Sequence, residues 1–196
     1  MTISAKDVQK LRMLTDTPMM DAKKALEEAN GDFEKAKDIL RKKGQAKAAK
    51  KAVRETREGL ISCYIHNGKI GVLIEVNSET DFVARNEKFK DFVHNVAMHI
   101  AAASPAYLTR EDVPKDVLLK EKGIFNEQLK SQNKPAEILE KIVAGKIEKF
   151  YSENVLLDQS YIKDDSKTVK DLTTEIIAIL GENVQIRRFT RYQIGD

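Results

Sequence analysis

Residues 75–86 read Glu-Val-Asn-Ser-Glu-Thr-Asp-Phe-Val-Ala-Arg-Asn and join a predicted strand to a predicted helix. Before this stretch, apolar side chains occupy every second position, which is typical of a strand that is buried on one face. After it, apolar side chains recur three and four positions apart, which predicts an amphipathic helix. The apolar positions are Ile70, Val72, Ile74 and Val76 in the strand, and Phe89, Phe92, Val93, Val96 and Ile100 in the helix. Because corners between elements often display functional residues, Asp81 and Phe82 are candidates for a binding site.

A purely structural interpretation of this corner competes with the functional one. Thr80 or Asp81 can cap the helix, because its side-chain oxygen can accept a hydrogen bond from a free N–H of the first turn. Phe82 and Val83 can then belong to the hydrophobic core, as large apolar residues usually do. On residue types alone, the structural interpretation is the favoured one.

Three short helices are predicted in residues 1–45. The first helix is predicted to begin at about Ser4. The start and stop signals of the other two are Thr17 with Pro18 and then Asn30-Gly31 for the second, and Asp32 and Gly44 for the third. A unit of this size has a small core and typically serves for docking, and it resembles a ubiquitin-associated-type fold. Met19 and Met20 point about 100° apart on a helix, so one of them is expected at the surface, where methionine suits an adaptable contact. The alternative is that both fill gaps in a loose core.

The basic charge of the chain is concentrated in one segment. Residues 41–58 contain eight Lys and Arg side chains and two Glu side chains, a net charge of +6, whereas the whole chain carries +3. The remaining residues are therefore acidic overall. Because the segment has no aromatic residue for base stacking and no base-reading motif, residues 46–58 are interpreted as a solvated basic linker. The alternative is a nucleic-acid-binding segment with a salt-dependent affinity for phosphates.

Residues 59–196 are predicted to form an α+β core. Asn67-Gly68, between two alternating strands, is the signal for a type I′ hairpin turn. Two helical arms joined at Gln132-Asn133-Lys134 predict a helical hairpin at about residues 111–151. The C-terminal pattern predicts a strand over 155–162, a helix over 168–180 and a last strand over 184–194. The expected fold is α+β: a three-helix module, then a small antiparallel sheet that packs with helices and carries the helical hairpin.

Composition argues against several classes of protein. No run of about 18 apolar residues occurs, so no membrane span is predicted, and the N-terminus lacks the apolar core of a signal peptide. The single cysteine, Cys63, fits a protein of the reducing cytoplasm. The sequence shows no metal-ligand spacing, no Gly-rich phosphate loop and no nucleophile–base signature. We therefore expect no metal, no cofactor and no enzymatic activity.

Residues 75–86 closely resemble the signature of the elongation factor Ts family, the nucleotide-exchange partners of elongation factor Tu in bacterial translation. Two further segments resemble family sequences, namely residues 11–26 of the N-terminal helices and Gly181-Glu182-Asn183 with the strand that follows. The resemblance covers the chain from end to end. Long family members carry two related core subdomains, whereas this chain has one Thr-Asp-Phe-Val tetrad and resembles the short form with a single core subdomain.

The resemblance implies a guanine-nucleotide exchange factor that binds GDP-bound and nucleotide-free elongation factor Tu in the cytoplasm. It implies that four corner residues lie against the partner's nucleotide domain and help to dislodge the magnesium ion that holds GDP: Thr80, Asp81, Phe82 and Val83. It also implies that the N-terminal helices bind the same partner through Leu11, Met19 and Met20. Neither a nucleic acid nor a membrane is an expected partner.

A homodimer is expected as well. A three-stranded sheet covered by helices on one face leaves its other face exposed, and a second copy of the chain would cover it by symmetry. Two other classes of function stay open on the residues alone. One is a nucleic-acid-binding protein that acts through residues 41–58, and the other is a ubiquitin-type adaptor that uses only the N-terminal helices.

Overall fold

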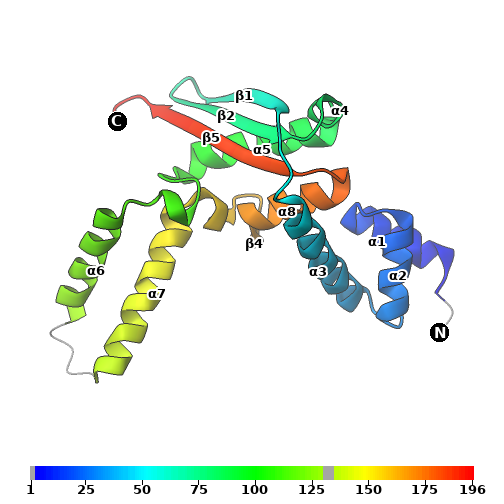
Figure 1. Cartoon of the computed structure of the whole chain (residues 1–196), viewed down its shortest axis with the longest axis horizontal. Helices are drawn as coiled ribbons and strands as arrows, with labels where there is room; N and C mark the ends of the chain where they lie inside the picture. Colours follow the sequence, from blue (N-terminus) through cyan, green and yellow to red (C-terminus); the bar gives the residue numbers. More distant parts are fainter. Residues whose placement is uncertain (1–2, 130–134) are drawn as a thin grey trace. The chain divides into compact units, whose positions relative to one another are not determined.

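The computed structural model describes residues 3–129 and 135–196, which form helices and two small sheets (Figure 1). The predicted α+β class is confirmed. The helices are α1 (Ala5–Thr15), α2 (Met19–Glu28), α3 (Phe33–Lys51), α4 (Asp81–Ala84), α5 (Glu87–Ala103), α6 (Lys115–Leu129), α7 (Ala136–Asn154) and α8 (Val169–Leu180), with 3-10 turns η1 (Arg110–Asp112) and η2 (Leu156–Asp158). The strands are β1 (Glu58–His66), β2 (Ile70–Ser78), β3 (Ser160–Tyr161), β4 (Asp164–Thr168) and β5 (Val184–Gln193).

The chain divides into two compact units, each built from three segments. The first consists of Met1–Ile61, Glu75–Val93 and Asp171–Arg187, and the second of Ser62–Ile74, His94–Lys170 and Arg188–Asp196. In this grouping the N-terminal helices fall in the same unit as parts of the core, and the domain boundaries at residues 45 and 58 stay a prediction. All the predicted site residues fall in the first unit.

Several predicted helix signals in the N-terminal region are confirmed. Ser4 caps α1 in a reciprocal capping box with Asp7. Asp32 caps α3 by accepting hydrogen bonds from two backbone N–H groups of its first turn. Asn30 and Gly31, with φ of 52° and 86°, adopt the left-handed conformation that ends α2. The three helices enclose a small apolar core of Val8, Leu11, Ala22, Ala25, Leu26, Ala29, Ala36 and Leu40.

Two predicted boundaries in this region are wrong. Pro18 is itself the N-cap of α2, and the hydroxyl of Thr17 lies 2.9 Å from that of Thr15 instead of capping the helix. α3 does not end at Gly44; its 19 residues run from Phe33 to Lys51, into the predicted linker. Gly44 faces α8, where a β-carbon on Gly44 would be in ordinary van der Waals contact with Cβ of Ala178, at 3.5 Å.

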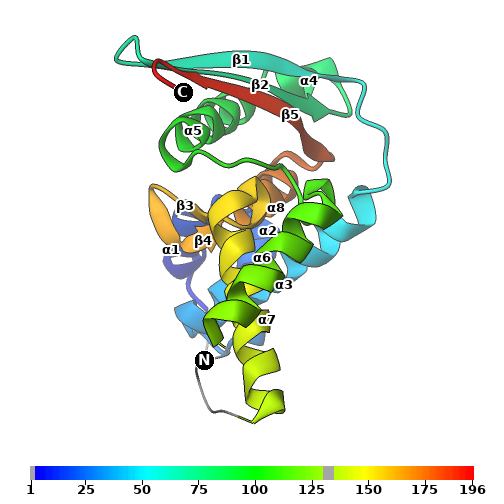
Figure 2. The same cartoon turned by 90° about the vertical axis from the view of Figure 1, so that its left-hand side faces the viewer.

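The larger sheet has the order β1-β2-β5. Asn67 and Gly68, with φ of 51° and 67°, form the turn between β1 and β2, as the hairpin signal predicts. β2 buries the predicted alternate residues Val72, Ile74 and Val76, and α5 lies along one face of the sheet (Figure 2). The predicted apolar face of α5 is buried throughout: Phe89, Phe92, Val93, Val96 and Ile100. β2 is therefore a well-packed strand that leads directly into the candidate corner.

The second unit carries the predicted helical hairpin, formed by α6 and α7 (Figure 1). Its predicted loop, residues 132–134, lies outside the described residues. The predicted strand over 155–162 is wrong. The backbone N–H groups of Leu156 and Leu157 donate to the carbonyl oxygens of Tyr107 and Leu108, which holds this segment in the turn η2. Only two residues of the segment then pair as β3 with the antiparallel β4.

Candidate functional site

The candidate corner contains a helical turn of its own. β2 ends at Ser78, the short helix α4 follows, and α5 begins at Glu87. Thr80 occupies the N-cap position of α4, but its side chain makes no capping hydrogen bond. The Thr80 hydroxyl instead donates to Oε1 of Glu182, at 2.8 Å. The capping interpretation therefore fails for Thr80, because its side chain is bound to a residue beyond α8.

Phe82 and Val83 have opposite environments although they are adjacent. Val83 is 9% exposed and packs into the first unit, as the structural interpretation expects. Phe82 is 79% exposed, so the structural interpretation fails for this residue. The aromatic ring leaves apolar surface in water, and removing such surface from water stabilises a complex by about 25 cal/mol per Å². The corner therefore presents an apolar side chain that a partner can bury.

Asp81 lies beside Phe82 at the start of α4 and pairs within the same turn. Its Oδ2 is 2.9 Å from Nη2 of Arg85; the Arg85 side chain is largely exposed and that of Asp81 is partly exposed. Ion pairs between exposed side chains contribute little to stability, typically about 0–1 kcal/mol. The carboxylate of Asp81 can therefore exchange Arg85 for a partner's donor at small cost.

The corner packs against the residues that follow α8. Both the hydroxyl and the backbone N–H of Thr80 donate to the carboxylate of Glu182. Lys51 is near this carboxylate and near Glu79. Burial lowers the pKa of Lys51 and the neighbouring Arg54 acts in the same direction, whereas Glu79 and Glu182 act to raise it. The site thus combines a backbone that is held at Thr80 with opposite charges, of Lys51 and Arg54 on one side and of Glu79 and Glu182 on the other.

A second group of exposed apolar residues gathers at the turn between α1 and α2. Met19 and Met20 are both exposed, and so are Met13, at 77%, and Leu14, at 59%. Leu11 has no exposed surface and belongs to the core of the three helices. We therefore correct the expectation that Leu11 contacts a partner directly, since its side chain supports the module from within.

Met13 and Leu14 are surface residues that the sequence pattern did not identify. Leu14 continues the three-residue spacing of Val8 and Leu11, which predicts a buried face, but it lies at the end of α1, beyond the small core. An ion pair of 2.8 Å joins Asp16, just after α1, to Lys88 at the start of α5. This pair brings the exposed apolar turn and the Phe82 corner to the same part of the first unit.

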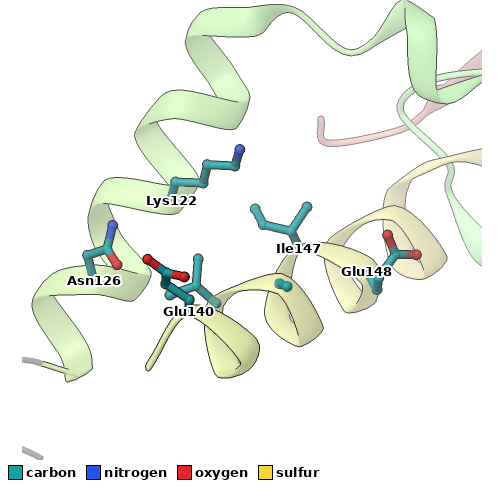
Figure 3. Close-up of a pocket in the computed structure, with 7 residues that line it drawn as sticks. Lys122, Asn126, Glu140, Ile147 and Glu148 are labelled. Atoms are coloured by element: carbon teal, nitrogen blue, oxygen red, sulfur yellow. The ribbon is translucent and has the colours of Figure 1, made fainter. Parts of the chain in front are cut away.

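A groove in the second unit contains none of the predicted site residues. It is an open groove along the seam of α6 and α7 (Figure 3), lined by Lys122, Asn126, Glu140, Val143, Ala144, Ile147 and Glu148. Glu148 is engaged by Arg110, whose guanidinium also binds Asp158. Among residues 3–129 and 135–196, no group of three or more His, Cys, Asp or Glu side chains is placed to hold a metal ion. No helix in the same residues is long and apolar enough to cross a membrane.

Three basic side chains of the segment pair with acidic side chains elsewhere in the first unit. Lys43 binds Glu28 and Lys47 binds Asp21, each at 2.8 Å, and Arg54 lies 3.3 Å from Glu79. These ion pairs neutralise part of the local positive charge. They favour the interpretation of the segment as a helix and connector over that of a phosphate-binding patch.

Comparison with known proteins gives one family along the whole chain. A family model described as "Elongation factor TS" matches residues 3–196. The protein named "Elongation factor Ts" of Fervidobacterium nodosum is 59% identical over 197 residues, which are 100% of both chains. That of Moorella thermoacetica is 57% identical over 195 residues, 99% of this chain and 96% of the relative. That of Thermotoga sp. (strain RQ2) is 56% identical over 197 residues, 100% of this chain and 98% of the relative.

Proposed function

Because this chain belongs to the elongation factor Ts family, we propose that it is a guanine-nucleotide exchange factor for elongation factor Tu in translation elongation. It binds GDP-bound elongation factor Tu in the cytoplasm, promotes release of GDP and leaves the nucleotide-free partner ready for GTP. No covalent step is needed. A protein that binds the nucleotide-free state more tightly than the GDP-bound state must weaken GDP binding by the same factor.

Phe82 carries the proposal. A ring that is 79% exposed on a short, anchored turn can enter an apolar space of the partner with little reorganisation of its own backbone. Magnesium demands near-ideal octahedral geometry, so a small displacement of the partner groups that support the ion weakens its hold on GDP. Phe82 acts as the wedge, and the adjacent Asp81 offers its carboxylate to the partner groups that have moved. Thr80 and Val83 hold the turn in place.

The exposed turn between α1 and α2 supplies the second contact with the same partner. Met13, Leu14, Met19 and Met20 form an apolar, conformationally adaptable surface. Their place in the first unit, near the Asp16–Lys88 ion pair, lets both surfaces meet one partner domain. This contact anchors elongation factor Tu while Phe82 acts on its magnesium site.

The proposed function is tested by the release of fluorescent GDP from purified elongation factor Tu. We expect release to become faster with rising concentration of the chain until it saturates. A rate that stays at the spontaneous value over the whole titration would contradict the proposal. The N-terminal helices alone should not accelerate release, since they lack the Phe82 corner, and this separates exchange from a simple adaptor function.

The basic segment is predicted to be secondary for exchange. Replacing Arg41, Lys42 and Lys50, which are exposed on α3, with Gln should leave the saturating rate of GDP release unchanged. Exposed charges away from an interface are screened within about 8 Å at physiological salt, so only the association rate should fall modestly. Loss of exchange at saturation, together with RNA binding that weakens steeply as salt rises, would favour the nucleic-acid alternative.

We also propose a homodimer through the open face of the larger sheet. In the second unit, Ile65 of β1 and Leu73 of β2 are exposed, while the alternate residues Val72 and Ile74 are buried. Exposed apolar residues that gather on one face of a sheet favour association. A second copy would bury them on both chains, because a two-fold interface uses the same surface of each copy. Cys63 is the single thiol of the chain, and the interface does not require a disulfide.

Sedimentation at micromolar concentration tests the dimer. The unmodified chain should sediment as a dimer, and Leu73→Glu should shift it to the monomer, because a charge at the centre of an apolar interface is strongly unfavourable. The helical content of the variant should be unchanged, since Leu73 is exposed in the single chain. A monomer at every concentration of the unmodified chain would contradict this proposal without affecting that of exchange.

A further inference from the structure

Two loops that are about a hundred residues apart in the chain exchange carboxylate hydrogen bonds beside the Phe82 corner. The backbone N–H of Thr80 donates to Oε2 of Glu182, at 3.0 Å, and its hydroxyl donates to Oε1 of the same carboxylate, at 2.8 Å. In the reverse direction, the backbone N–H of Asn183 donates to Oε1 of Glu79, at 2.6 Å. Each loop thus contributes one carboxylate and one backbone donor. We refer to Glu79, Thr80, Glu182 and Asn183 as the carboxylate clamp.

The hydrogen bonds of the carboxylate clamp are expected to be strong, because their acceptors are charged. Hydrogen bonds to a charged acceptor are roughly twice as strong as hydrogen bonds between neutral groups. Asn183 is buried, and its side-chain amide donates to the backbone oxygen of Arg54 at 2.8 Å. Arg54 in turn lies 3.3 Å from Glu79 and offsets its charge. Arg54 therefore offsets the charge of Glu79, and Glu182 is held by the two donors of Thr80.

The α4 turn needs such an anchor. A helix of four residues is not stable by itself, because the cost of nucleating a turn is recovered only over a longer helix. Thr80 is held on both sides, since its N–H and hydroxyl bind Glu182 and its carbonyl oxygen accepts a hydrogen bond from Ser78 Oγ at 2.9 Å. At the other end of the turn, Val83 is buried. Phe82 lies between these two fixed points and is itself exposed.

We propose that Glu182, together with Glu79, is a positioning residue that holds the exchange corner in its partner-ready conformation. The Glu182 carboxylate touches no partner in this role and acts through Thr80. This inference rests on the proposed function. If only a fraction of the molecules holds the competent corner, the apparent dissociation constant rises by the inverse of that fraction, while the rate in the saturated complex is unchanged. Loss of the clamp should therefore weaken binding rather than slow the saturated reaction.

Hydrogen exchange of the Thr80 amide tests the clamp directly. In the unmodified chain, this amide should be protected from exchange. In Glu182→Gln it should exchange at least about tenfold faster, which corresponds to about 1.4 kcal/mol, because the substitution removes the negative charge of the acceptor and leaves one acceptor oxygen for the two donors of Thr80. An unprotected Thr80 amide in the unmodified chain would overturn the inference without the use of any variant.

GDP-release titrations test the consequence for exchange. Glu182→Gln should raise the concentration for half-maximal stimulation about tenfold, or 1.4 kcal/mol, and keep the saturating rate within about twofold. Glu55→Gln is the matched control: it makes the same change of charge in the same unit, at an exposed residue that pairs with Arg57. It should alter neither quantity. If Glu182 had only a structural role, Glu182→Gln would lower the melting temperature and the fraction of active molecules. It would not raise the half-maximal concentration while leaving the saturating rate unchanged.

The outcomes separate the inference from the proposed function. Unchanged half-maximal concentration in Glu182→Gln, or a fall in the saturating rate alone, would overturn the positioning role. If the unmodified chain fails to stimulate GDP release, the proposed function fails, and the hydrogen-exchange result still decides whether the clamp exists. If Glu182→Gln does not fold, Glu79→Gln weakens the other half of the clamp, the hydrogen bond from the Asn183 N–H, and should raise the half-maximal concentration in the same direction.

Discussion

Phe82→Ala should melt like the unmodified chain and yet lose at least tenfold of its stimulation of GDP release. Because Phe82 is exposed, truncation should change the free energy of unfolding by less than about 0.5 kcal/mol. In a complex, an aromatic anchor that a partner buries commonly contributes 2 kcal/mol or more, and about 1.4 kcal/mol already corresponds to a factor of ten. Thermal melting and the kinetics of fluorescent GDP release, measured on the same preparation, separate the two effects.

Ile194→Ala is a suitable control for this variant. Ile194 is 75% exposed, close to the exposure of Phe82, and lies outside the proposed partner surfaces. It should leave both the melt and the exchange rate unchanged. A melting temperature of Phe82→Ala far below that of the unmodified chain would show that Phe82 acts as a core residue. If both the melting temperature and the rate of GDP release are unchanged, Phe82 takes no part in the mechanism.

Gly59→Ala is expected to be the most destabilising exchange of one small residue for another in this chain. The residue has φ of 152°, and a β-carbon there would lie 2.3 Å from the carbonyl oxygen of Val76 and 2.7 Å from Cα of Asn77. Both are backbone atoms of β2 and cannot move as a flexible side chain would. The strands must therefore separate or β1 must rotate, at a cost of about 3 kcal/mol. For a protein of this size, that lowers the melting temperature by roughly 6–12 °C.

Gly71→Ala in the neighbouring strand β2 provides the matched control. A β-carbon at Gly71 would meet no atom within 4 Å, and its φ is not in the left-handed region. Since alanine restricts the unfolded chain more than glycine does, this variant should be neutral or stabilised by up to about 1 kcal/mol. Equal melting temperatures of the two variants would show that β1 can yield at Gly59 without loss of stability.

The sequence by itself determined the elements whose signals lie within a few neighbouring residues. Asn67-Gly68 specifies the hairpin turn, because both residues tolerate left-handed φ values. Ser4 and Asp32 mark helix starts through hydrogen bonds to the next turn of the same helix. The periodicity around residues 75–86 gave both the buried face of β2 and that of α5. The candidate corner was located in the same way, at the point where the period changes.

Only the tertiary structure decided features that depend on residues far apart in the chain. Gly44 is a helix-stop signal in the sequence, but in the structure α3 continues through it to Lys51, and Gly44 faces Ala178 of α8. Leu11 and Leu14 share one helical face in the sequence, and the limited size of the three-helix core buries the first and exposes the second. Phe82 and Val83 are both apolar, and local patterns cannot tell which one the fold buries.

The carboxylate clamp shows the physical reason most clearly. Glu182 belongs to a segment that resembles the family, yet nothing in the residues near it indicates a bond to Thr80. That bond joins positions 102 residues apart and exists only because the chain brings the end of α8 against the end of β2. Local hydrogen bonds and periodicity are properties of short segments, whereas exposure, close approach and long-range pairing are properties of the packed chain.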